Sequence, residues 1–184
     1  MIVSFYDPSQ FDALADAFED MGRHYFGPAA PDRATLRQTL ADEILGEHSG
    51  VTLVVAMAQA RVAGFATVSI LYPAPGYKGQ LFMKDLYTCA AWRGHGVGEA
   101  IMRFLARHAL RTGCVRFDWT TENTNAGAIA FYERLGARQV PEKIYFRLTL
   151  PEIEALAVQP PGAGAPTPEP LGSGQTAPNP RNTG

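Results

Sequence analysis

Residues 93–98, Arg-Gly-His-Gly-Val-Gly, form a glycine-rich turn between an apolar strand-like run and an amphipathic helix. Glycine lets a backbone approach a ligand closely, and the first N–H groups of a helix have no partner inside it. Such a helix start binds anions, including phosphate and pyrophosphate. The turn therefore predicts a site for a phosphate-bearing ligand; the alternative is an ordinary turn before a helix.

Two common phosphate-binding motifs do not fit this turn. A dinucleotide-binding turn that starts at Gly94 needs its third glycine at position 99, which is Glu99. A P-loop needs a Lys-Ser or Lys-Thr pair after the glycines, and none follows here. The phosphate site must therefore belong to another class.

A second stretch, residues 125–137, reads Asn-Ala-Gly-Ala-Ile-Ala-Phe-Tyr-Glu-Arg-Leu-Gly-Ala. Asn125 or Thr124 is the expected N-cap of a helix, and Gly136 is the expected C-terminal stop. The helix places Ile129, Tyr132 and Leu135 on one face. Taken alone, the Phe-Tyr pair is also typical of simple core packing.

Together the two stretches resemble the GCN5-related N-acetyltransferase (GNAT) family, in the family's order and at its spacing. The turn resembles the R/Q-x-x-G-x-G/A loop that holds the pyrophosphate of acetyl-CoA, and residues 125–137 resemble N-x-x-A-x-x-F-Y-x-x-x-G-F/A. The resemblance implies the GNAT fold, acetyl-CoA as co-substrate, no metal, and transfer of an acetyl group to a primary amine. It assigns acetyl-CoA binding to Leu86, Tyr87, Thr88, Arg93, Gly94, His95, Gly96, Val97, Gly98, Glu99 and Asn125.

The resemblance also suggests how the reaction proceeds. A primary amine has a pKa of about 10.4, so removing its proton at neutral pH costs about 4 kcal/mol before attack begins. Tyr132 matches the family tyrosine that donates a proton to the departing CoA thiolate. Backbone groups of residues 86–88, on a strand that parts from its neighbour, would contact the cofactor.

The family's proposed general base is absent from this chain. Residues 77–137 look most like the diamine (spermidine/spermine-type) branch, which carries Glu-Asp where this chain has Lys84-Asp85. The family's glutamate is thus replaced by Lys84, which would repel a polycation if it faced the acceptor. Asp85 remains the candidate proton acceptor, and its alternative role is to anchor a loop through hydrogen bonds. Strand alternation sends the two side chains to opposite faces unless a bulge intervenes.

In this family the first two helices line the acceptor pocket. The resemblance therefore suggests Glu19, Asp20 and Tyr25, together with Asp85, as acceptor-binding residues. A pair of carboxylates on a helix is also typical of a solvated face.

Composition and charge indicate the expected partners and compartment of the protein. The chain has 184 residues, of which 46% are hydrophobic, and a net charge of −2, which disfavours nucleic acid as a partner. Cys89 and Cys114 lie in apolar runs, so we expect buried thiols in a reducing compartment rather than a disulfide. Without a signal-peptide pattern or a run of about 18 apolar residues, we expect a soluble, cytoplasmic protein that does not enter a membrane.

Periodicity predicts a mixed α/β sheet flanked by helices, in the order β-α-α-β-β-β-α-β-α-β. The expected strands cover residues 2–6, 51–57, 62–71, 80–89, 114–120 and 142–150. The expected helices start at Asp7-Pro8, cover residues 32–45, run from the glycine turn to residue 112, and follow Asn125. We expect the acetyltransferase domain to span residues 1–152, and residues 153–184 to form a Pro/Gly/Ala-rich tail, largely disordered.

Three functions remain open. The first is acetylation of a small amine such as a diamine, polyamine, amino acid or aminoglycoside. The second is acetylation of a protein N-terminus or lysine side chain, and the third is an acyl-CoA sensor without turnover. Family members often dimerise through their final strands, so a homodimer is a further expectation.

Overall fold

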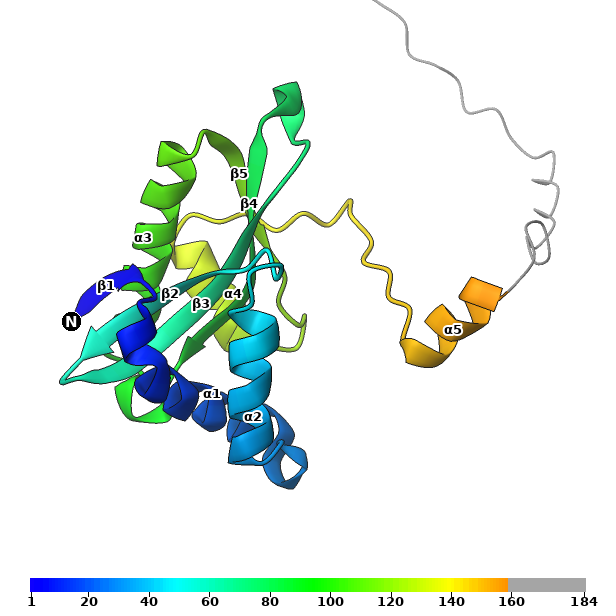
Figure 1. The fold of residues 1–184 in the computed structure, drawn as a ribbon. Helices are drawn as coiled ribbons and strands as arrows, with labels where there is room; N and C mark the ends of the chain where they lie inside the picture. Colours follow the sequence, from blue (N-terminus) through cyan, green and yellow to red (C-terminus); the bar gives the residue numbers. More distant parts are fainter. Residues whose placement is uncertain (159–184) are drawn as a thin grey trace, which may run out of the picture. The chain divides into compact units, whose positions relative to one another are not determined.

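The computed structural model describes residues 1–158, and its core is a five-stranded sheet with helices on both faces (Figure 1). The strands are β1 (Ile2–Phe5), β2 (Thr52–Ala58), β3 (Arg61–Leu71), β4 (Gly79–Thr88) and β5 (Cys114–Trp119). The helices are α1 (Phe11–Phe26), α2 (Arg33–Thr39), α3 (Val97–Arg111), α4 (Ala126–Arg134) and α5 (Leu150–Val158).

The strands lie in the order β1-β2-β3-β4-β5. The first four are antiparallel neighbours, whereas β5 runs parallel to β4. A parallel neighbour needs a crossover connection, and α3 supplies it. The carboxyl end of β4 leads through a short 3-10 turn, Ala90–Trp92, into the glycine turn and α3. This edge of the sheet is therefore the natural place for a ligand.

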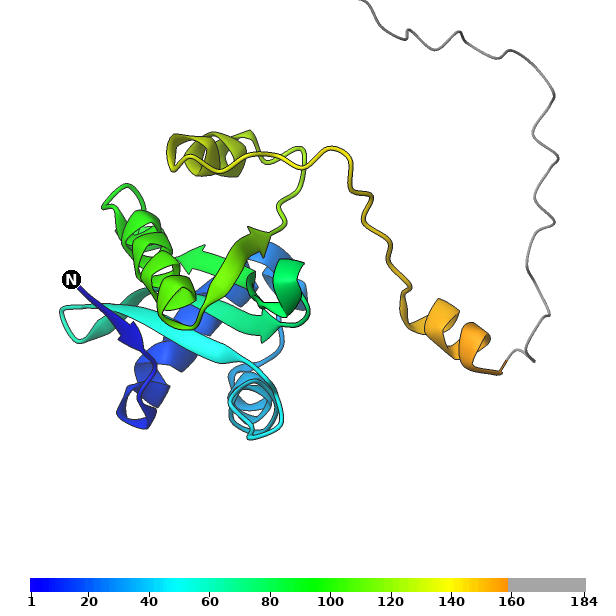
Figure 2. The ribbon, with the colours of Figure 1, turned by 90° about the horizontal axis from the view of Figure 1, so that it is seen from above.

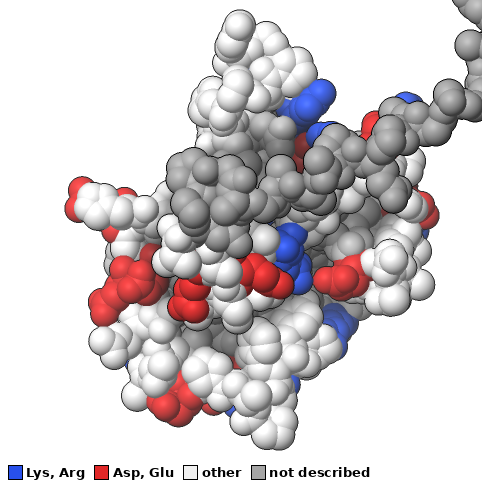
Figure 3. Space-filling model, turned by 90° about the vertical axis from the view of Figure 1, so that its right-hand side faces the viewer, with Lys and Arg blue, Asp and Glu red and all other residues white. Residues whose placement is uncertain are grey.

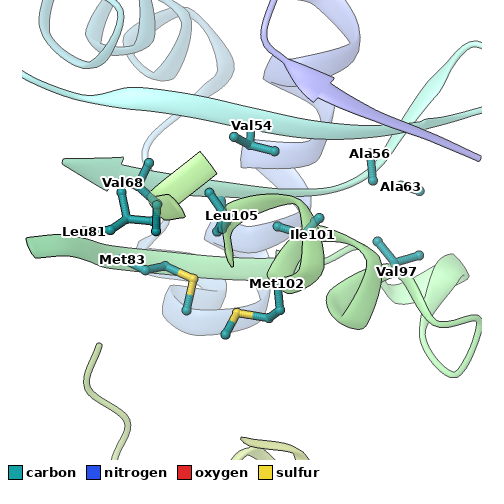
Figure 4. Close-up of a cluster of buried hydrophobic side chains, with 12 residues drawn as sticks. Val54, Ala56, Ala63, Val68, Leu81, Met83, Val97, Ile101, Met102 and Leu105 are labelled. Carbon is teal, nitrogen blue, oxygen red and sulfur yellow. The ribbon is translucent and has the colours of Figure 1, made fainter. Parts of the chain in front are cut away.

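Two apolar clusters, one on each face, hold the sheet between its helices (Figure 2). On one face α3 packs onto the sheet with Ile101, Leu105 and Val97, all at most 1% exposed (Figure 4). On the other face Leu14 of α1 and Leu40 pack with Phe65 of β3. α4 adds partly buried side chains to the α3 cluster, so α3 and α4 lie on the same face of the sheet.

The first nine expected elements are present, with ends shifted by a few residues. Asp7 caps a short 3-10 turn, Pro8–Gln10, that leads into α1, and Gln10 completes its capping box. The second helix continues beyond α2 as a π-helical turn, Leu40–Ile44. Gly136 follows α4 with a φ of +87°, the left-handed conformation expected of a C-terminal glycine.

The prediction of a strand over residues 142–150 is wrong. Residues 143–149 form no helix or strand, and Ile144 and Phe146 are 78% and 86% exposed. A segment with alternating apolar residues is able to join a sheet. It forms a strand only where a neighbouring strand offers backbone hydrogen bonds. Instead, the Glu152 carboxylate accepts hydrogen bonds from the Thr149 N–H and from the Thr149 hydroxyl where α5 starts, and Pro151 lies in the first turn of the helix.

The chain divides into two compact units, Met1–Arg138 and Gln139 onward. The domain boundary that we expected after residue 152 stays a prediction, and the disorder expected for residues 159–184 lies outside the described residues.

Of the two free cysteines, Cys89 is buried as expected, whereas Cys114, at the start of β5, is only half-buried. Within residues 1–158 no helix is both long and apolar enough to cross a bilayer.

Leu105→Ala should lower the free energy of unfolding by about 2–5 kcal/mol, because it empties a fully buried position in the α3 cluster. Leu110→Ala is the matched control on the same helix, at a position that is 78% exposed, and should change it by less than about 0.5 kcal/mol. Urea denaturation measures both variants. Equal effects of the two substitutions would contradict the assignment of this core.

Candidate active site

β4 parts from β5 before β4 ends. Parallel pairing runs from Gly79↔Cys114 to Met83↔Trp119, whereas β4 stays paired with β3 as far as Thr88↔Gly64. From Lys84 to Thr88, in the part of the chain that is described, β4 has a partner strand on its β3 side alone. Backbone groups on the other side of this segment are therefore available to a ligand that enters between the strands.

The glycine turn stands at the end of this opening. Gly94 and Gly96 have φ values of +77° and +74°, a conformation that L side chains rarely adopt. The Ala100 N–H donates to the Gly96 carbonyl, so helical bonding begins there, and the first N–H groups of α3 lie before it. At Gly98 a Cβ atom would lie 3.3 Å from the Phe131 ring, so α3 and α4 meet closely beside the turn.

Two side chains of the turn contact groups of the turn itself or of the end of β4. The Arg93 Nε donates to the Thr88 carbonyl at 3.3 Å, and its Nη2 lies 3.5 Å from the Tyr87 hydroxyl. The His95 Nδ1 lies 2.8 Å from the Arg93 carbonyl. In this structure both side chains hold the shape of the turn.

Asp20 connects α1 to the end of β4. Its Oδ2 accepts hydrogen bonds from the Tyr87 hydroxyl at 2.8 Å and from the Ala90 N–H at 3.0 Å. Partial burial works to raise the pKa of Asp20, but these hydrogen bonds, with Arg23 and Arg93 nearby, outweigh it and hold the pKa below its usual value. Asp20 is therefore an ionised link between α1 and the end of β4.

Two buried groups beside Asp20 stay protonated at neutral pH. Burial, and then the hydrogen bond to Asp20, raise the pKa of the Tyr87 hydroxyl. Burial, and then the Asp20 charge, raise the pKa of the Cys89 thiol to about 11. Cys89 is thus a packed, unreactive thiol.

Tyr132 lies on α4, half-buried against Trp119 at the end of β5, with ring centroids 4.9 Å apart. Burial, and then the proximity of Tyr25, raise its pKa, so the phenol keeps its proton at neutral pH. Tyr25, at the end of α1, also packs beside Tyr87, with ring centroids 6.2 Å apart. Side chains of α1, β4 and α4 therefore converge on the opening.

The remaining predicted residues have partners of their own. Asn125 is the N-cap of α4, as expected, and its Oδ1 accepts from the Ala128 N–H at 3.1 Å. Glu99 pairs with Arg103 at 2.7 Å. Glu19 pairs with Arg23 at 2.9 Å and with Arg33 at 2.5 Å, so its carboxylate links α1 to α2.

Asp85 is held by a residue that we did not predict, Thr67 of β3. The Thr67 hydroxyl donates to Asp85 Oδ2 at 2.8 Å, and Lys84 Nζ lies 3.8 Å from Oδ1. A register shift in the β3–β4 pairing brings Lys84 and Asp85 to the same side. Nothing in the sequence could have identified Thr67 as this partner, because the bulge arises from strand pairing.

These features fit the phosphates and the extended arm of acetyl-CoA. The turn offers backbone donors at a helix start, and β4 offers unpaired backbone beside it. A neighbouring hollow of about 620 Å³ lies between α3, β5 and α4 and is lined mainly by apolar and aromatic side chains. In the described part of the chain no group of three or more His, Cys, Asp or Glu is arranged to hold a metal ion.

Asp20→Asn should lower the free energy of unfolding by about 1–2 kcal/mol at pH 7, because it removes a charge that accepts two hydrogen bonds in a half-buried site. Since the folded-state pKa is depressed, the difference from wild type should persist above about pH 4 and shrink as the pH falls below that. Urea denaturation at several pH values measures it. Asp16→Asn, in an exposed ion pair, is the control; a difference that does not vary with pH contradicts the assignment.

Comparison with known proteins finds relatives that are named N-acetyltransferases. In Arabidopsis thaliana, L-ornithine N5-acetyltransferase NATA1 is 30% identical over 95 residues, which cover 52% of this chain and 42% of that protein. The thialysine N-epsilon-acetyltransferase of Sus scrofa is 34% identical over 62 residues, covering 34% and 36% respectively. The chain thus aligns with less than half the length of these curated relatives.

A solved integron cassette protein from the mobile metagenome of V. cholerae is 37% identical, with a TM-score of 0.83, and the match covers 86% of this chain and 98% of that one. A probable acetyltransferase of known structure has a TM-score of 0.70 at 21% identity, which speaks for the fold alone. The model of the Acetyltransferase (GNAT) family matches residues 11–137, which contain α1 to α4, the glycine turn and Tyr132. This chain therefore belongs to the GNAT acetyltransferase family.

Proposed function

We propose that this protein transfers the acetyl group of acetyl-CoA to a primary amine of a small molecule. The observation that carries the proposal is the opening between β4 and β5, which ends at the glycine turn. The names of the relatives support it, since the ornithine and thialysine enzymes are both named for small amine acceptors. Streptothricin acetyltransferase of Streptomyces lavendulae, 35% identical over 85 residues, is named for another small molecule.

We assign acetyl-CoA to this opening. The N–H groups at the start of α3 would hold its pyrophosphate, and the free backbone side of residues 84–88 would hold its extended arm. The co-substrate supplies an acetyl thioester. Arg93 and His95 would keep the turn in the shape that exposes its N–H groups.

The acceptor must lose a proton before it attacks. We assign Asp85 as the acceptor of that proton, because Thr67 fixes one of its oxygens and the side chain remains 37% exposed. The amine nitrogen then forms a bond to the acetyl carbon, the carbon–sulfur bond breaks, and the nitrogen releases its second proton. The products are an acetamide and CoA.

Tyr132 would protonate the departing sulfur. Its raised pKa keeps the hydroxyl protonated, and its position on α4 near Tyr25 supports this role. An alkyl thiol has a pKa of about 8.5, so the thiolate also leaves without help and the contribution of Tyr132 should be partial.

The direct test is the release of CoA thiol from acetyl-CoA by the purified full chain, with the rate in the absence of an acceptor subtracted. The acceptors are spermidine, putrescine, ornithine, lysine, an aminoglycoside and a short peptide. Release with a small amine supports the proposal. Release with the peptide alone indicates a protein acetyltransferase, and tight acetyl-CoA binding without release indicates a sensor.

Tyr132→Phe should lower kcat about 100-fold, the lower end of the range for general acid catalysis, and leave the Kd for acetyl-CoA nearly unchanged. Steady-state kinetics and calorimetry measure the two quantities. Tyr77→Phe, on an exposed turn away from the opening, is the control. An unchanged kcat in Tyr132→Phe contradicts the assigned role.

A further inference from the structure

The bulge in β4 lies where the strand leaves β5. Thr67 faces Asp85, whereas the next residue of β3, Val68, faces Met83, so Lys84 is an extra residue in the strand. Met83 is also the last residue of β4 that pairs with β5. Lys84 is therefore the first residue of the open segment, and a bulge at such a place redirects side chains.

The bulge presents two opposite charges side by side. Lys84 Nζ lies 3.8 Å from Asp85 Oδ1, too far for a strong hydrogen bond, and their side chains are 77% and 37% exposed. An ammonium has three donors and a carboxylate about four acceptor positions, so both groups can take further partners. An exposed ion pair of this kind adds little to the free energy of unfolding, so a contribution to folding stability does not by itself explain why Lys84 and Asp85 lie together.

The other carboxylates at the end of α1 leave no surplus of negative charge. Glu19 pairs with Arg23 and Arg33, and Asp20 lies near Arg93. One face of the molecule, seen in Figure 3, likewise has basic side chains between its acidic groups. A diamine or polyamine needs uncompensated carboxylates, and these residues do not provide them.

We propose, resting on the function proposed above, that the acceptor is a zwitterion: an amino acid with a second amine, in which a carboxylate accompanies the ammonium groups. Lys84 binds the carboxylate, and Asp85 receives an ammonium. Lys84 is thus a specificity-determining residue that favours amino acids over diamines lacking the carboxylate.

The test compares acceptors that differ by one carboxylate: ornithine with putrescine, and lysine with cadaverine. For the wild-type chain, kcat/KM should be about 10- to 100-fold higher for the amino acid of each pair, the effect of a hydrogen bond to a charged group. Lys84→Gln should reduce this ratio to about one. Lys84→Glu should invert it in favour of the diamine.

Lys78→Gln, at another exposed lysine, is the matched control and should keep the wild-type ratio. Thermal unfolding and the Kd for acetyl-CoA establish that each variant is folded. A wild-type preference for diamines, or an unchanged ratio in Lys84→Gln, overturns this inference while the acetyltransferase proposal stands. Failure to acetylate any amine of the panel overturns the proposed function itself.

Discussion

The separation of β4 from β5 after Met83 is the constraint on which the rest of the site depends. A strand in the middle of a sheet normally has both of its sides hydrogen-bonded, so an open segment of five residues must be stabilised by other contacts. On one side, β3 pairs with Asp85–Thr88 of this segment, and the bulged Lys84 alone is skipped. Apolar clusters on both faces then keep this half-open strand in place.

The polar contacts near the opening follow from this arrangement. Tyr87 is buried on the α1 face, and its hydroxyl finds Asp20, which also binds the Ala90 N–H just before the glycine turn. Arg93 returns from the turn to the end of β4. The helix that would border the acceptor and the turn that would hold the cofactor are therefore tied to the same few residues of β4.

Much of this could be predicted from local sequence, because the signals are local. The glycines of residues 94–98, the Asn125 cap and the apolar stripes of α1 and α3 each specify their own conformation. The pairing of Asp85 with Thr67 and the position of Asp20 between two elements depend on register and packing. The alternation over residues 142–150 predicted a strand, but no local signal reveals whether a partner strand is present. The Thr-x-x-Glu spacing of Thr149 and Glu152 was a local signal for the start of α5 that we missed.

Hydrogen–deuterium exchange with and without saturating acetyl-CoA tests the central claim most directly, because it reports which backbone amides the ligand covers. The account predicts slower exchange at residues 85–88 and 96–99, with no change in β1. Saturable binding that leaves those two segments unchanged and protects only the hollow between α3, β5 and α4 would contradict it.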